Sequence, residues 1–89
     1  MAVTVLSNAT LSVAVPPRFT SIVPTNGGGL HLELAGTTGR VYAIEATADL
    51  TQPQWSALTT NTATNGVVPF DDTSAGAFSN RFYRGLFIR

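Results

Sequence analysis

The chain of 89 residues contains no cysteine and no lysine. Without cysteine, neither a disulfide framework nor a thiolate metal site can form. Without lysine, a crosslink between a lysine and an asparagine side chain is excluded as well. The folded state must therefore be stabilised by apolar packing and by the backbone hydrogen bonds of its secondary structure.

Charge is also scarce. Charged residues make up 11% of the chain, against about 25% in an average soluble domain. Five arginines balance three aspartates and two glutamates, so the net charge is zero. Because binding to nucleic acid phosphates needs clustered positive charge, we expect no nucleic acid partner. A neutral surface also lacks the repulsion that keeps domains apart, which favours a module held among neighbours.

Long hydrophobic runs are missing too. The apolar runs are far shorter than the roughly 20 residues of a membrane-spanning helix, so we expect no membrane insertion. The first residues, Met-Ala-Val-Thr, carry no basic segment ahead of an apolar run. They therefore do not resemble a signal peptide.

What the chain does contain is a series of short apolar segments separated by glycine, proline, asparagine and aspartate. No helical spacing of apolar residues is sustained over two turns, and the abundant valine and threonine favour strands. The clearest two-residue period runs from Leu30 to Ala35. Strands are expected at residues 19–23, 30–35, 41–47, 55–60, 67–70 and 80–88, with one or two more within 3–5 and 11–15.

The turn sequences predict how some of these strands pair. Strands 30–35 and 41–47 are expected to form an antiparallel hairpin, because a glycine-containing turn separates them. Asn65-Gly66 is a strong signal for a two-residue hairpin turn. It is expected to pair strand 55–60 with strand 67–70.

Together these expectations describe an all-β fold, a small antiparallel β-sandwich of about seven strands. The chain divides at Pro16-Pro17, because proline ends a strand and stiffens the link that follows. Residues 1–17 are expected to form an N-terminal strand arm and junction, and residues 18–89 the sandwich module. The expected core and structural residues are Leu30, Leu32, Leu34, Tyr42, Ile44, Trp55, Leu58, Phe70, Phe82 and Tyr83.

Four motifs between residues 30 and 86 carry a resemblance: G-x-x-G-x-x-Y-x-I-E-A-x-x-D-L, W-x-x-L-x-T, G-x-x-x-F-x-D and R-F-Y-R. They resemble a β-sandwich module found near the C-termini of large secreted proteins of environmental bacteria, described as fibronectin-type-III-like or immunoglobulin-like. The matching residues are Gly36, Gly39, Tyr42, Ile44, Glu45, Asp49, Leu50, Trp55, Leu58, Thr60, Gly66, Phe70, Asp72, Arg81, Phe82, Tyr83 and Arg84.

The resemblance implies a non-catalytic structural, spacer or interaction module of a multidomain bacterial protein, secreted or on the cell surface. Its implied partners are neighbouring domains of the same polypeptide, or identical subunits that meet through edge strands. A fold alone does not determine the function of a protein. A carbohydrate- or surface-binding module, with a polysaccharide as partner, therefore stays an alternative.

Residues 8–17, with the sequence N-A-T-L-S-V-A-V-P-P, resemble something else. They are similar to the last strand of an immunoglobulin-like repeat and the junction that follows it. Residues 1–15 would then be the end of a preceding repeat. Such a strand can add to an open sheet edge, so a further alternative is a self-assembling subunit in which residues 1–15 complete a neighbour's sheet.

No catalytic constellation is evident, and we expect neither enzymatic activity nor a cofactor. His31 is the only histidine, and no G-x-S-x-G motif or second histidine accompanies it. It is expected to be a solvated strand residue. Trp55 is expected in the core, with a stacking platform for a sugar as the alternative. Phe78, in the loop after Asp71, is the best exposed aromatic, so Phe78 and Trp55 are the candidates for ligand or interface contact.

Aspartates supply the only metal candidate. Asp71 and Asp72, with Asp49, could hold calcium through loop oxygens, but the D-x-D-x-D-G spacing of a calcium loop is absent. We expect these aspartates to be turn residues whose side chains bond to their own backbone. Glu45 and Arg84 are expected to pair across neighbouring strands.

Overall fold

The computed structural model describes residues 2–7 and 17–89. In this part of the chain it contains seven strands and one short 3-10 helix. Their order is β1 (Ala2–Ser7), β2 (Arg18–Pro24), β3 (Leu30–Ala35), β4 (Val41–Thr47), β5 (Ser56–Thr62), β6 (Val67–Asp72), η1 (Ala75–Ala77) and β7 (Asn80–Phe87).

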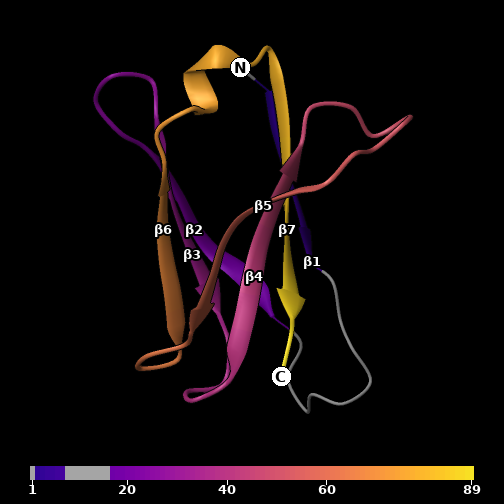
Figure 1. Cartoon of the computed structure of the whole chain (residues 1–89). Helices are drawn as coiled ribbons and strands as arrows, with labels where there is room; N and C mark the ends of the chain where they lie inside the picture. Colours follow the sequence, from indigo (N-terminus) through magenta and orange to yellow (C-terminus); the bar gives the residue numbers. More distant parts are fainter. Residues whose placement is uncertain (1, 8–16) are drawn as a thin grey trace.

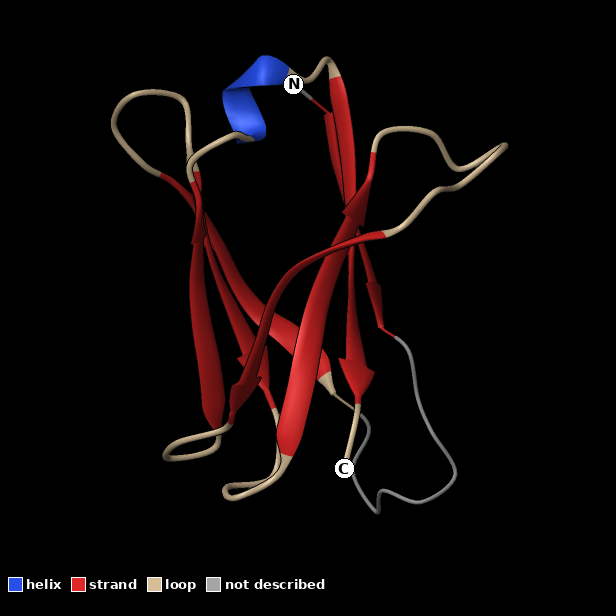
Figure 2. Cartoon of the chain, in the orientation of Figure 1, coloured by secondary structure: helices blue, strands red, loops and turns tan. Residues whose placement is uncertain are grey.

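The strands form two layers that face each other (Figure 1, Figure 2). One sheet has the order β1-β7-β4-β5 and the other the order β2-β3-β6. The pairings are antiparallel except between β1 and β7, which run parallel from Ala2 opposite Asn80 to Ser7 opposite Gly85. The chain therefore adopts the all-β sandwich expected from its sequence, and β1 is the strand that departs from the antiparallel arrangement.

The core lies between the sheets and follows the two-residue period of the strands. On β3, Leu30, Leu32 and Leu34 are 5%, 0% and 0% exposed, while the residues between them are half-buried. The opposite sheet contributes the inner faces of β4 and β7. The buried cluster consists of Leu30, Leu32, Leu34, Tyr42, Ile44, Ala46, Ala63, Val68, Ala75 and Tyr83, with Phe19, Ile22, Leu58, Phe70 and Phe87 packed against it.

The expected hairpin of β3 and β4 is wrong, because these strands lie in different sheets. Their inner side chains nevertheless meet in one core. The chain crosses between the sheets over the ring of Tyr42: a Cβ on Gly36 would lie 2.5 Å from that ring. The Thr37 backbone N–H donates to the Tyr42 hydroxyl at 2.7 Å. A buried tyrosine that bonds the backbone a few residues upstream thus makes the corner.

The Asn65-Gly66 turn forms, but the hairpin expected around it does not. Asn65 and Gly66 have the positive φ values of 54° and 77° that a type I′ turn requires. Beyond the single bridge from Thr64 to Val67, β5 and β6 belong to different sheets. The flanks of the turn bond to different partners: the Ala63 N–H donates to the Arg40 carbonyl at 2.8 Å, and the Gly66 carbonyl accepts from Gly36. The turn therefore carries the chain from one sheet to the other.

Three residues lie in positions that differ from those expected from the sequence. Trp55 and Phe82 are only partly buried and lie outside the core cluster. Phe82 alternates with the buried Arg81 and Tyr83 on β7, so it belongs to the outer face of the sheet. Pro17, assigned above to the arm, is a fully buried side chain of the sandwich.

The strand expected at residues 11–15 lies outside the described residues. In the part of the chain that the structure describes, no helix is both long enough and apolar enough to cross a membrane.

Candidate functional site

A buried ion pair joins the two sheets at one end of the sandwich. Asp72 ends β6 in one sheet and Arg81 is the second residue of β7 in the other, and the two residues are 3% and 7% exposed. Arg81 Nε donates to Asp72 Oδ2 at 2.8 Å. The Tyr83 hydroxyl, on the same face of β7, donates to the same oxygen at 2.7 Å. One carboxylate therefore connects both layers.

The hydrogen bonds keep this carboxylate ionised. Burial by itself raises the pKa of Asp72, but the bonds from Arg81 and Tyr83 outweigh burial and hold its pKa below the ordinary value. Burial, together with the bond to Asp72, raises the pKa of Tyr83, so its hydroxyl stays protonated as a donor. Asp72 Oδ1 accepts from the Ser74 backbone N–H at 3.1 Å. With these three bonds, the buried charge meets the requirement that its oxygens be partnered.

Phe78 covers the guanidinium from outside. Arg81 Cζ lies 4.2 Å from the centre of the Phe78 ring and 5.8 Å from that of Tyr83. Both distances permit a cation–π interaction. Because Phe78 directly follows η1, this contact holds the short helix over the end of the sandwich, where Figure 2 shows it.

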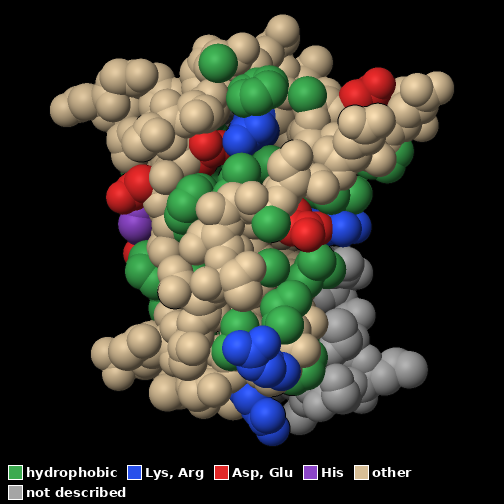
Figure 3. Space-filling view, in the orientation of Figure 1, with side chains coloured by type: hydrophobic (Ala, Val, Ile, Leu, Met, Phe, Trp, Pro, Cys, Tyr) green, Lys and Arg blue, Asp and Glu red, His purple; other side chains and the backbone are tan. Residues whose placement is uncertain are grey.

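An open cleft of about 320 Å³ lies beside this contact. Its buried residues are Ala46, Thr47 and Arg81, and Phe78 forms part of its edge. On the face drawn in Figure 3, a basic side chain lies among hydrophobic ones near the end of the molecule that carries η1. The other lining residues, all exposed, belong to β5 and the connection before it: Ala48, Asp49, Gln52, Gln54 and Ser56.

Hydrogen bonds shape the β4–β5 connection that forms this wall. The Thr47 hydroxyl accepts from the backbone N–H of Gln54 at 3.3 Å and of Asp49 at 3.4 Å, so both ends of the loop are tied to β4. Asp49 Oδ1 accepts from the Thr51 hydroxyl at 2.7 Å and from its N–H at 2.8 Å. These bonds from Thr51 hold the pKa of Asp49 below its ordinary value, so the cleft has an anionic edge.

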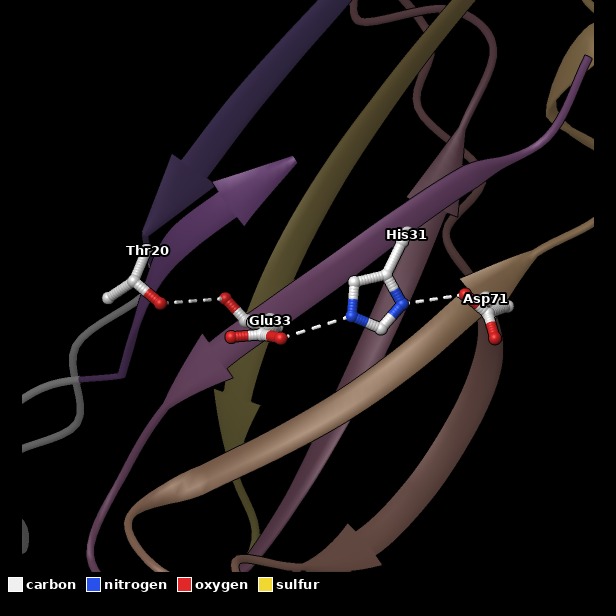
Figure 4. Close-up of polar contacts among 4 residues, drawn as sticks. All are labelled: Thr20, His31, Glu33 and Asp71. Atoms are coloured by element: carbon white, nitrogen blue, oxygen red, sulfur yellow. Dashed lines mark hydrogen bonds and ion pairs between the residues drawn. The ribbon is translucent and has the colours of Figure 1, made fainter. Parts of the chain in front are cut away.

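A second polar cluster lies on the outer face of the three-stranded sheet (Figure 4). His31 Nδ1 lies 2.6 Å from Asp71 Oδ1, and His31 Nε2 lies 3.1 Å from Glu33 Oε2. His31 and Asp71 are register partners on β3 and β6, and Thr20 on β2 donates to the Glu33 carbonyl at 3.4 Å. Because carboxylates only accept, both ring nitrogens must donate, which favours the imidazolium. The bonds to Asp71 and then Glu33 therefore raise the pKa of His31.

A third cluster lies on the outer face of the four-stranded sheet. Arg84 and Glu45 are register partners on β7 and β4, and Arg84 Nε donates to Glu45 Oε1 at 2.7 Å. The expected Glu45–Arg84 pair is thus confirmed. The Arg84 guanidinium also lies 4.3 Å from the centre of the Trp55 ring. One face of Trp55 is therefore covered by Arg84, and the ring is not part of the core.

The calcium candidate is not supported by the geometry. Asp71 is exposed and bonds to His31, whereas Asp72, the next residue on β6, is buried and bonds to Arg81. Asp49 bonds to Thr51 in the β4–β5 connection. Among the described residues, no group of three or more acidic, histidine or cysteine side chains is placed to hold a metal ion.

The network of Asp72, Arg81 and Tyr83 was not predicted from the sequence, although all three residues belong to the four motifs. One signal could have revealed it. Arg81 and Tyr83 are two residues apart on a strand, so they share a face, and Tyr83 was expected in the core. A buried arginine requires an acidic partner, and the aspartate that ends the preceding strand was the nearest one in sequence.

No protein-family model, curated protein or solved structure matches this chain.

Replacing Asp72 with asparagine should destabilise the fold strongly. The substitution leaves Arg81 buried without its counter-charge, which costs about 3–5 kcal/mol. Since the pKa of Asp72 is lowered in the folded state, its contribution is complete above the pKa of the unfolded aspartate and disappears as the pH falls through the folded value. The difference in unfolding free energy between wild type and D72N, measured by urea denaturation, should therefore shrink in acid.

The control is D71N, one residue away on the opposite face of β6, which at neutral pH should change the unfolding free energy far less. Equal stability of D72N and wild type at neutral pH would contradict the role given to this carboxylate. A difference in unfolding free energy between wild type and D72N that stays constant in acid would contradict it as well.

His31 should titrate above its ordinary pKa of 6.5. Its two carboxylate partners stabilise the folded protein while the ring is charged, so this contribution is complete below pH 6.5 and disappears as the pH rises through the folded pKa. Because the protein has one histidine, a single imidazole NMR signal reports the value.

D71N should lower this pKa more than E33Q, because the bond to Asp71 is the shorter one. High salt should reduce the elevation, since these groups are exposed. A titration midpoint at or below 6.5, or one that neither substitution moves, would show that the cluster does not form in solution.

Proposed function

We propose that the chain is a non-catalytic structural or spacer module of a secreted multidomain bacterial protein, of the fibronectin-type-III-like or immunoglobulin-like kind. The observation that carries this proposal is that residues of the motifs shared with such modules have structural tasks. Tyr42 and Ile44 fill the core, and Gly36 accommodates the Tyr42 ring. A pattern built from packing residues and turn residues encodes a scaffold.

The charged motif residues have structural partners as well. Glu45 pairs with Arg84 across two strands of one sheet. Asp72 pairs with Arg81 across the two sheets, and Asp49 bonds to Thr51 within a turn. Groups engaged in this way orient the backbone and hold the layers together. Such an arrangement supports a module that holds neighbouring domains at a set spacing.

The surface composition supports the same role. On the face drawn in Figure 3, charged side chains are few and lie among neutral ones. The whole chain carries no net charge, so nothing in its overall electrostatics repels a neighbouring domain. The secreted bacterial setting rests on the resemblance of the four motifs.

Placed between two reporter domains, the full chain should hold them at a defined distance. The sandwich has a longest extent of 34 Å and is cross-linked internally by the Asp72–Arg81 pair, so it should act as a stiff element. Spin labels on the two reporters should give a narrow distance distribution in pulsed electron paramagnetic resonance.

The matched control is a glycine–serine linker of the same number of residues, which behaves as a flexible coil and should give a broad distribution. A distribution as broad for the module as for the linker would overturn the spacer function.

A second candidate function, assembly from identical chains, is favoured by the position of β1. This strand lies at the edge of the four-stranded sheet and pairs with β7 in parallel. Parallel pairing is slightly less stable per residue than antiparallel pairing. The same six-residue pairing can form between two copies if each β1 adds to the β7 of its partner.

Strand exchange predicts that the mass in solution rises with concentration for residues 1–89. Deletion of residues 1–15 should abolish the rise and lower the midpoint of thermal unfolding, because β7 then loses β1 and pairs with β4 alone. Light scattering and calorimetry on both proteins test this. Identical mass and identical stability of the two proteins would rule out exchange.

A further inference from the structure

We propose that the cleft between Phe78 and the β4–β5 connection binds one ring of a neutral, hydroxyl-rich ligand, that is, a sugar unit of a carbohydrate. The inference goes beyond the spacer function and does not depend on it. The cleft is an open hollow at one end of the sandwich, with Ala46, Thr47 and Arg81 as its buried lining.

Small residues leave this end of the sandwich open. Ala46 and Ser56 are register partners on β4 and β5, and both line the cleft. Deeper in the sandwich, the same face of β4 carries Ile44 and Tyr42, which fill the core. The resulting space of about 320 Å³ lies at the lower end of the range of small-ligand pockets, roughly 300–1,000 Å³.

The polar groups around this space suit hydroxyls. Gln52, Gln54 and Ser56 line it with groups that both donate and accept, and Asp49 adds acceptor oxygens. Arg81 lines it from the protein side; its Nε bonds to Asp72, and a guanidinium carries further N–H donors. A sugar hydroxyl donates and accepts at once, so it can satisfy such a mixed set.

The charges around the cleft select a neutral ligand. The charge of Arg81 is balanced by Asp72 at 2.8 Å. Asp49, whose Oδ1 is oriented by Thr51, then leaves the cleft edge with negative charge. A phosphate, sulfate or uronate would be repelled by Asp49 and would find no unbalanced cation within the lining.

Phe78 supplies the apolar contact that a sugar ring needs. Its side chain is half-buried and lines the cleft, and Arg81 holds it in place from 4.2 Å. Trp55, by contrast, is not among the cleft residues. Chain alternation explains the difference, because Gln54 and Ser56 face the cleft whereas Trp55 faces Arg84 on the outer sheet surface.

The test is a titration of the full ¹⁵N-labelled chain with neutral oligosaccharides: cellopentaose, xylopentaose and N-acetylchitopentaose. At least one should shift the side-chain amide signals of Gln52 and Gln54 and the Arg81 Nε–H signal in a saturable way. An open cleft of this size should bind in the millimolar range, so the titration extends to about 10 mM. An oligogalacturonate of equal length should bind more weakly.

F78A and Q54A should each weaken binding of the active oligosaccharide about tenfold, which corresponds to the loss of one favourable contact. The matched controls are W55A, an aromatic residue outside the cleft, and N61A, an exposed amide on β5. Both should leave the affinity unchanged. If circular dichroism shows that F78A is unfolded, the comparison of oligosaccharide affinity between Q54A and N61A tests the proposal.

Three results would overturn the proposal: no shift with any neutral oligosaccharide, preference for the oligogalacturonate, or loss of binding in W55A with F78A unaffected. A negative titration combined with a narrow reporter distance would reject the cleft and retain the spacer. Saturable binding combined with a broad distance distribution would retain the cleft and reject the spacer. The two proposals can therefore fail independently.

Discussion

A single buried carboxylate connects the layers of this protein. Asp72 ends a strand of one sheet, and its partners Arg81 and Tyr83 lie near the start of the last strand of the other. The same carboxylate accepts from Ser74, where the chain turns toward η1. Since Phe78 follows η1 and packs on Arg81, the loop, the short helix and the edge of the cleft all depend on one ion pair. A chain without disulfides has few other ways to tie two sheets at their open end.

Two further charged clusters lie on the outer faces of the sheets and share one arrangement. His31 lies between two carboxylates on one outer face, and Arg84 lies between Glu45 and Trp55 on the other. The His31–Asp71 and Glu45–Arg84 contacts each join register partners on neighbouring strands. Such cross-strand pairs contribute modestly to stability but favour one strand register over its neighbours. The charges of these two clusters thus align strands, whereas Arg18, Arg40 and Arg89 are exposed on the surface.

Much of the fold could be predicted from the sequence, because a two-residue period needs only local information. The strands at residues 30–35 and 41–47 were expected with the bounds that the structure has. The pairing of strands was harder. The Asn65-Gly66 turn was identified correctly, yet the strands on either side of it join different sheets. A turn specifies the reversal of the chain, whereas the choice of neighbour depends on which backbone groups elsewhere compete for hydrogen bonds.

The candidate site shows the same division. The sequence by itself determined the β-class, the alternating leucines of β3 and the Glu45–Arg84 pair. Only the tertiary structure decided that Trp55 lies outside the core, that Asp71 and Asp72 serve different clusters, and that Phe78 borders a cleft with Gln54 and Arg81. The physical reason is distance along the chain. Local alternation sets which face a side chain takes, but a cleft or a buried ion pair arises where segments far apart in sequence meet, and no local pattern encodes that meeting.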